Sequence, residues 1–267
     1  MLTLFPQYRI GLGVGWVATG AAAGLMIQTG AAWYWVAALV LVCGFAALAI
    51  AELAAASQHQ RLLMILYQKG DPDGFIKAYE PLLSQRCTAP GRLLTLRAYL
   101  SNAYLAKGDF ERAKQLLDEA PEVTGREAEN AKALLAGNRC TIALRSGDTQ
   151  EAGRQLRLLS EARQRGRADD KLFADLPLLR ELLSVREGRP CDTAAIRTAS
   201  EKAVSPIRRA DMLLELGMAL EAEGKRKEAV LILRRAVGGN TALWSVRQAK
   251  EMLAQLETDT GKKTNCH

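Results

Sequence analysis

The sequence predicts an all-α protein built from an apolar N-terminal helical hairpin and a larger array of helix pairs. Up to Ala51 the only charged side chain is Arg9, whereas beyond it basic and acidic residues are interspersed. In that second region a turn centred on glycine recurs at intervals of 36 to 41 residues, between stretches rich in leucine and alanine. The turn glycines are Gly70, Gly108, Gly147, Gly188 and Gly224. A period in this range is typical of stacked helical repeats that bury their apolar faces on one another.

These patterns divide the chain into three regions. Residues 1–51 are predicted to form a transmembrane helical hairpin, residues 52–257 a helical repeat domain, and residues 258–267 a disordered tail. The repeat domain is expected to be an α-solenoid of about five helix pairs. A final helix, from Thr241 to Glu257, carries an apolar stripe that would cap the stack.

The hairpin prediction rests on two apolar segments, residues 10–27 and 32–51. Each is close to the roughly 20 residues that a helix needs to cross a bilayer. Only Gln28-Thr29-Gly30 separates them, so the two helices must run antiparallel if both are inserted. The aromatic run Trp33-Tyr34-Trp35 follows at once and is typical of a membrane interface. We therefore expect an integral membrane protein that contacts the lipid bilayer through residues 10–51.

Basic residues near the ends of the hairpin predict its orientation. Arg9 precedes the first segment and Lys69 follows the second, but the connecting link has no lysine or arginine. By the positive-inside tendency, both termini and the repeat domain should be cytoplasmic. Between Ala31 and Lys69 there is no proline. We therefore expect the second membrane helix to continue into the first repeat helix, as a rod of about 39 residues and about 58 Å.

Three further patterns in the hairpin have alternative interpretations. The spacings Gly11 to Gly15 and Gly20 to Gly24 favour close packing against the second segment, or else dimerisation with another copy. A signal peptide cleaved near residues 21–23 is disfavoured because a second apolar segment follows directly. The stretch at residues 13–18 matches a dinucleotide-binding fingerprint, but no strand precedes it and no acidic residue follows at the expected distance.

The repeat units share a pattern of small and large apolar residues around each turn. The clearest unit contains Leu100, Ser101, Tyr104, Gly108-Asp109-Phe110, Ala113, Leu117 and Ala120. A second contains Leu216, Gly217, Leu220, Gly224, Ala229, Leu233 and Ala236, and a third keeps Cys140, Ala143, Ala152 and Leu156. From Glu52 to about Gly239 the sequence resembles the tetratricopeptide repeat (TPR) family. Small residues at these positions would let the two helices of a unit approach closely.

The resemblance implies a partner-binding inner face, lined by the first helix of each unit. By register with the turn glycines, the candidate residues are Arg61, Tyr67, Asn102, Thr141, Arg145, Arg186 and Glu221. Arginine pairs with carboxylates in a two-pronged geometry, so an acidic protein or peptide partner is favoured. The basic clusters at residues 163–167 and 225–227 would either contact anionic lipid or serve solubility.

Other kinds of site find little support in the sequence. No catalytic motif occurs, the two histidines lie far apart, and the five cysteines form no C-x-x-C pair, so we expect no enzyme activity, cofactor or metal. Mixed charge signs disfavour nucleic-acid binding. The sequence therefore predicts a membrane-anchored cytoplasmic adaptor or scaffold that mediates protein–protein interactions without catalysis. The alternative is a structural or assembly subunit that packs through its hairpin in a larger membrane complex.

Overall fold

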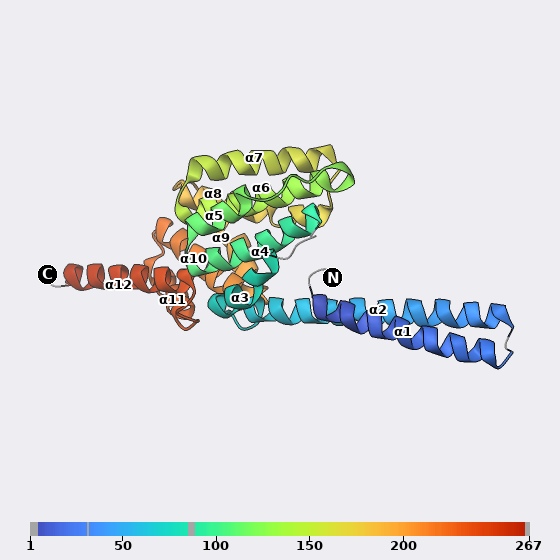
Figure 1. The fold of residues 1–267 in the computed structure, drawn as a ribbon. Coiled ribbons are helices and arrows are strands. Elements are labelled where there is room, and N and C mark those ends of the chain that lie inside the picture. Colours follow the sequence, from blue (N-terminus) through green and yellow to red (C-terminus); the bar gives the residue numbers. More distant parts are fainter. Residues whose placement is uncertain (1–4, 31, 85–88, 265–267) are drawn as a thin grey trace. The chain divides into compact units, whose positions relative to one another are not determined.

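The computed structural model describes residues 5–30, 32–84 and 89–264, and these are helical, with no strand among them (Figure 1). This confirms the all-α prediction. The chain forms two compact units, of which the first extends to Leu63 and the second begins at Met64. Ser84 also belongs to the first unit.

The first unit contains a helical hairpin made of α1 (Pro6–Gln28) and most of α2 (Trp33–Tyr67). Proline at the start of α1 suits a helix N-terminus, where its missing N–H is not needed. Both helices are long and apolar enough to cross a membrane. Helix α2 continues without a break past Ala51, as expected from the absence of proline, and ends at Tyr67 instead of at Lys69.

The two helices of the hairpin approach through a tryptophan and a glycine. A Cβ atom added at Gly44 of α2 would lie 2.5 Å from the ring of Trp16 of α1, so only glycine fits beneath that ring. Of the predicted glycine pairs only Gly15 faces α2, where its Cβ would lie 3.5 Å from Ala47; Gly11, Gly20 and Gly24 face no described atom within 4 Å. The prediction that both glycine spacings pack against α2 was therefore wrong.

The periodicity of the α-helix explains why most of these glycines do not face α2. The residues of α1 that are buried in the hairpin include Thr19 and Ala23, which are four apart and so share one face. Gly20 and Gly24 are each one position further along, which turns them about 100° around the helix axis and away from α2. These two glycines therefore leave a notched surface on the side of α1 that α2 does not cover.

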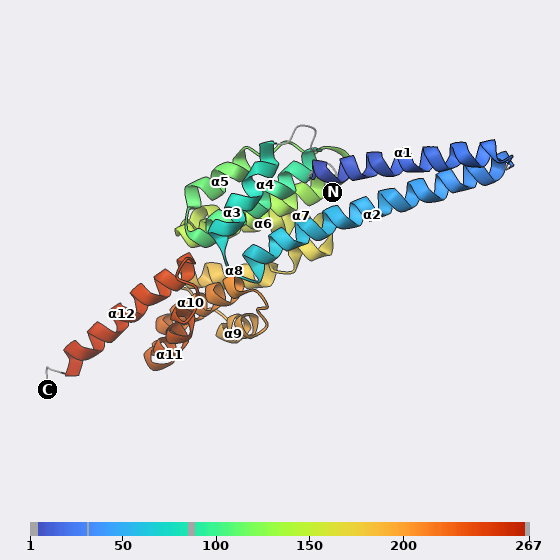
Figure 2. The same cartoon turned by 60° about the horizontal axis from the view of Figure 1, so that its bottom comes forward.

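The second unit is a succession of helices that pack on their neighbours in the sequence (Figures 1 and 2). After the last turn of α2 come α3 (Pro72–Tyr79), α4 (Pro90–Lys107), α5 (Phe110–Asp118), α6 (Ala128–Ser146), α7 (Thr149–Arg165), α8 (Leu176–Arg186), α9 (Thr193–Glu201), α10 (Pro206–Ala222), α11 (Arg226–Val237) and α12 (Trp244–Thr264). Short 3-10 segments cover Glu80–Ser84, Gly125–Glu127 and Asp170–Phe173. Helix α4 packs on α5, α6 on α7, and α10 on both α9 and α11, while α4, α6, α8 and α10 contact one another in that order.

The recurring glycine turns end one helix and start the next. Each of the five turn glycines has a positive φ, from 65° at Gly70 to 92° at Gly108, a conformation that glycine adopts without steric cost. In the first four turns an aspartate then caps the following helix, as Asp109 does by accepting a hydrogen bond of 3.1 Å from the amide of Arg112. The Gly-Asp signature thus meets two local requirements of the backbone: glycine allows the positive φ that ends one helix, and aspartate caps the start of the next.

Small residues lie where the helices of a pair approach, as predicted. Ser101 Oγ donates a hydrogen bond of 2.9 Å to the Ala113 carbonyl, and Cys140 Sγ lies 3.6 Å from the Ala152 carbonyl. A Cβ at Gly217 would lie 2.6 Å from a Leu233 methyl group. Larger side chains at any of these positions would push the paired helices apart.

Helix α12 closes the second unit by contacting its early part. It packs on α10, α11 and α4, and Trp244 lies over Gly108, where an added Cβ would be 2.6 Å from the indole ring. The guanidinium of Arg247 donates to the Lys107 carbonyl at 2.6 Å, and Asn240 donates to the Gly70 carbonyl at 2.9 Å. The last helix therefore does more than cap the final pair, because it ties that end of the unit to the first two turns.

Two sequence expectations about the C-terminus need correction. The final helix begins at Trp244 instead of Thr241, and its backbone stays helical to Thr264, where a disordered tail was predicted from residue 258. Helix propagation is cooperative, so a helix anchored by packing extends through a sequence that has no proline to stop it. Residues 265–267, the end of the predicted tail, lie outside the described residues.

Candidate functional site

The best candidate site is a cavity of about 320 Å³ on the side of the second unit that α4, α6, α8 and α10 share. Four of the seven residues predicted for an inner face line it. They are Tyr67 from the end of α2, Asn102 from α4, and Thr141 and Arg145 from α6. The remaining lining residues include Asn138, Arg208 and Asp211, together with leucines from α8.

The other three predicted residues lie elsewhere. Arg61 is exposed on the part of α2 that belongs to the first unit. Arg186 is on α8, one turn beyond the cavity lining residue Leu182, and its side chain is largely buried. Glu221 is exposed in the last turn of α10. The structure therefore brings four of the seven predicted residues together around one cavity, whereas Arg61, Arg186 and Glu221 lie outside its lining.

The uncharged polar side chains of the cavity wall donate their hydrogen bonds to other groups of the protein. The Asn102 amide donates to the Tyr67 hydroxyl at 3.4 Å, and the Asn138 amide donates to the Leu134 carbonyl at 3.1 Å. The Thr141 hydroxyl donates to the Gly137 carbonyl at 3.0 Å. The amide oxygens of Asn102 and Asn138 accept no hydrogen bond from the described residues, so both remain available as acceptors.

Two buried ion pairs join α6 and α8 to α10, and the first of them is part of the cavity wall. Arg145 of α6 pairs with Asp211, and Arg186 of α8 pairs with Glu215 at 2.5 Å. All four side chains are no more than 13% exposed. Asp211 and Glu215 are four residues apart and therefore share one face of α10. A buried charge needs a partner of opposite sign, so these pairs fix how the three helices sit against one another.

Several atoms of this buried network have no hydrogen-bond partner in the described part of the chain: Asp211 Oδ1, Glu215 Oε2 and Arg186 Nε. Two of the three are acceptors. Burial raises the pKa of the Glu215 carboxyl, against the opposing effect of the neighbouring Arg186 and Arg145 guanidinium groups. Leaving such a buried group unsatisfied costs about 1–3 kcal/mol.

Sequence reasoning identified the two arginines but missed the two carboxylates. The available signal was a pair of acidic residues, Asp211 and Glu215, enclosing the apolar run Met212-Leu213-Leu214 in the middle of a helix. Charged residues on an otherwise buried stretch usually have a partner. The pairing also changes the chemistry expected of the arginines, because neither Arg145 nor Arg186 is free to bind an acidic partner.

The remaining charges that line the cavity are balanced as well. Arg208 donates to both carboxylate oxygens of Asp175, at 2.6 and 2.9 Å. With Arg145 paired to Asp211, the charged lining therefore has equal numbers of basic and acidic groups. The net charge of the lining therefore favours a ligand of neither sign.

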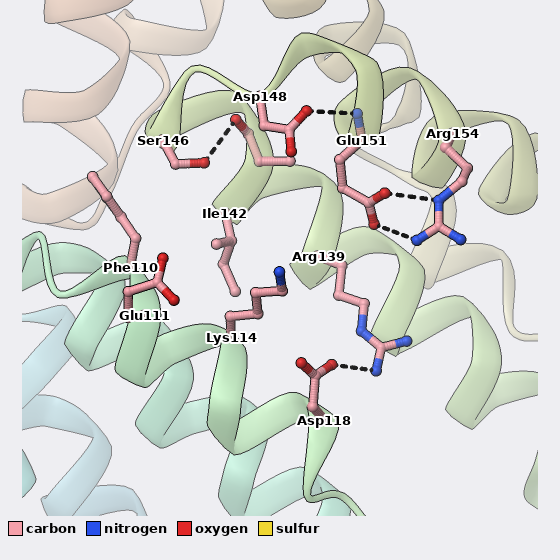
Figure 3. A pocket seen from close by; sticks show the side chains of 11 residues that line it. Phe110, Glu111, Lys114, Asp118, Arg139, Ile142, Ser146, Asp148, Glu151 and Arg154 are labelled. Atoms are coloured by element: carbon pink, nitrogen blue, oxygen red, sulfur yellow. Dashed lines mark hydrogen bonds and ion pairs between the residues drawn. The ribbon is translucent and has the colours of Figure 1, made fainter.

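A second cavity, of about 430 Å³, lies between α5, α6 and the start of α7 (Figure 3). Phe110 and Ile142 line it together with charged side chains that pair among themselves. Arg139 contacts Asp118 at 2.8 Å, and Arg154 makes two hydrogen bonds of 2.7 Å to Glu151 that lower the pKa of this carboxyl to about 2. Most of these groups are well exposed and already partnered, so this cavity is the weaker candidate.

Reactive groups are scarce among the described residues. No cluster of three or more His, Cys, Asp or Glu side chains that could hold a metal ion occurs there. Burial raises the pKa of the Cys140 thiol to about 12, which keeps it protonated and unreactive. Cys87 lies outside the described residues. No protein-family model matches this chain, and neither a curated protein nor a solved structure matches it.

Proposed function

We propose that this protein is a membrane-anchored, non-catalytic adaptor whose helical unit is a TPR-like solenoid that binds a segment of a partner protein in its inner cavity. The five helix pairs would be the end of α2 with α3, then α4/α5, α6/α7, α8/α9 and α10/α11, with α12 as the capping helix. Residues 10–51 would span the membrane, and the basic residues flanking them favour a cytoplasmic helical unit.

The observation that carries the proposal is the convergence of side chains from successive first helices on one cavity. Tyr67, Asn102, Thr141 and Asp211 come from four different pairs, yet all line the same space. A volume of about 320 Å³ is in the range of sites that hold a few side chains or a small molecule. TPR-like arrays hold partners on this face, so the resemblance and the geometry favour the same surface.

The chemistry of the wall favours a ligand that donates hydrogen bonds. The amide oxygens of Asn102 and Asn138 supply acceptors, while the arginines of the lining are already paired with Asp211 and Asp175. An extended peptide presents backbone N–H groups at regular intervals and matches such a wall. The proposal therefore replaces the acidic partner expected from the arginines with a peptide recognised mainly through its backbone and its donor side chains.

Site-specific photo-crosslinking in intact membranes tests this proposal. A photoreactive amino acid at Thr141, inside the cavity, should crosslink to one discrete partner segment, whereas the same amino acid at Leu158, exposed on α7, should not. A synthetic peptide with the crosslinked sequence should bind the detergent-solubilised protein, and Asn102→Ala should weaken that binding about 5- to 10-fold, the value of one hydrogen bond. Equal crosslinking from the two positions would contradict the proposal.

A second candidate function is a structural subunit that packs through its hairpin in a larger membrane complex. The observation that favours it is the uncovered face of α1, where Gly13, Gly20 and Gly24 have no described atom within 4 Å of an added Cβ. Small residues on one face allow another membrane helix to approach closely. Replacing the hairpin with an unrelated one distinguishes the two functions, because the adaptor should keep its partner and the subunit should lose its complex.

A further inference from the structure

The outer side of α11 and the facing part of α12 form a groove of about 880 Å³ that is separate from the inner cavity. Lys227, Val230, Leu231 and Arg234 line it and share one face of α11, since they are spaced three or four residues apart. Leu231 is 61% exposed although it is a large apolar side chain. Beyond its contact with α11, α12 extends away from the other helices of the unit (Figures 1 and 2).

The rim of this groove carries an excess of positive charge. Four basic side chains line it, Lys225, Arg226, Lys227 and Arg234, against the two acidic ones Glu228 and Glu257. Both acidic side chains are paired, Glu228 with Arg197 at 3.3 Å and Glu257 with Arg234 at 2.8 Å, and the basic Lys225 pairs with Glu223 at 2.8 Å. The arrangement is thus an apolar strip, centred on Leu231, beside the exposed Lys227 on a rim that carries a net positive charge.

We propose that this groove docks an amphipathic helix with acidic flanks, supplied by a partner protein. An apolar strip with charged borders is the usual receptor for a helix whose apolar residues recur every three or four positions. Glutamates beside that apolar face would pair with the exposed Lys227, whereas a basic helix would be repelled. A groove suits a convex helix, while a bilayer surface requires side chains that protrude, so the concave shape favours the helix over anionic lipid.

The test uses the full-length protein in nanodiscs of zwitterionic lipid and a fluorescein-labelled synthetic helix of 18 residues with a leucine face flanked by glutamates. Fluorescence anisotropy should show saturable binding. Leu231→Asp should weaken that binding at least 10-fold, because it places a charge in the apolar strip, and Lys227→Glu should weaken it about 5-fold. Both side chains are exposed, so neither change should alter the helical circular-dichroism spectrum.

The matched control is Leu158→Asp, which puts the same charge at an exposed leucine on α7 and should leave binding unchanged. A second peptide, with lysines in place of the glutamates, should bind at least 10-fold more weakly. Absence of binding, or equal binding by Leu231→Asp and the unchanged protein, overturns the proposal. It is also overturned if anionic lipid in the nanodisc abolishes peptide binding, because the lipid surface is then the occupant of the groove.

Discussion

The inner cavity and the α11–α12 groove differ in whether their basic side chains are buried or exposed. At and next to the inner cavity the guanidinium groups of Arg145 and Arg186 are buried, and each has a carboxylate from α10. On the outer groove Lys227 is exposed, and the basic side chains of the lining outnumber the acidic ones. Burial accounts for the difference, since a charge removed from water requires a partner, whereas an exposed charge is stabilised by water itself. Arginines expected to attract a partner can therefore stabilise the fold, and an exposed lysine such as Lys227, first assigned to solubility, can take part in binding.

The largest expected effect comes from breaking an inner pair. Arg186→Met leaves Glu215 buried without its partner and should lower the free energy of unfolding by about 3–5 kcal/mol. Arg154→Met, which breaks an exposed pair with Glu151, should cost less than about 1 kcal/mol. Urea unfolding of the detergent-solubilised protein, followed by circular dichroism, measures both.

The double variant Arg186→Met/Glu215→Leu provides the control for this comparison. Removing both charges also removes the unpaired carboxylate, so most of the lost stability should return. Equal destabilisation by Arg186→Met and Arg154→Met would show that burial does not distinguish the two regions.

The next effect concerns the contact between α12 and the second turn. Gly108→Ala and Gly147→Ala both place alanine at a positive φ, 92° and 85°, which costs about 1 kcal/mol each. Only Gly108 lies beneath Trp244, so its alanine variant should lose a further 1–3 kcal/mol, roughly, through the clash. Thermal unfolding of the two variants checks this difference. If they melt at the same temperature, the closure by α12 contributes nothing to stability.

Smaller effects are expected from pH, with opposite signs in the two environments. Burial raises the pKa of Glu215, so its contribution to stability is complete below the unfolded value of about 4.5 and is lost as the pH rises through the folded pKa. Arg154 lowers the pKa of Glu151 to about 2, so its contribution is present above about 4.5 and is lost as the pH falls towards 2. Melting temperatures of Glu215→Gln, Glu151→Gln and the unchanged protein, measured between pH 2 and 8, test this. The stability lost in Glu215→Gln should become smaller as the pH rises, and the stability lost in Glu151→Gln should become smaller as the pH falls towards 2.

The smallest expected effect is that of salt on the two binding surfaces. Raising the salt concentration from 50 to 500 mM should weaken peptide binding at the α11–α12 groove several-fold, because exposed charges are screened. Crosslinking from Thr141 in the inner cavity should change little, since the charged side chains that line this cavity are paired with one another. A salt dependence of equal size at both surfaces would remove the distinction between them.

The sequence by itself determined the local features of this protein. Gly108 and Asp109 are predictable because a left-handed backbone and a helix cap are requirements of adjacent residues. The small residues Ser101, Cys140 and Gly217 were likewise assigned correctly to the contact between paired helices. The two apolar N-terminal helices followed from segment length and composition alone.

Only the tertiary structure decided which distant residues meet. Arg145 and Asp211 are 66 positions apart, and Arg247 reaches a carbonyl 140 positions away. Such contacts depend on the angles and distances at which the helices pack, and these are the sum of many side-chain interactions that no local sequence pattern records. The same packing brings Trp244 onto Gly108 and places Tyr67, Asn102 and Thr141 around one cavity.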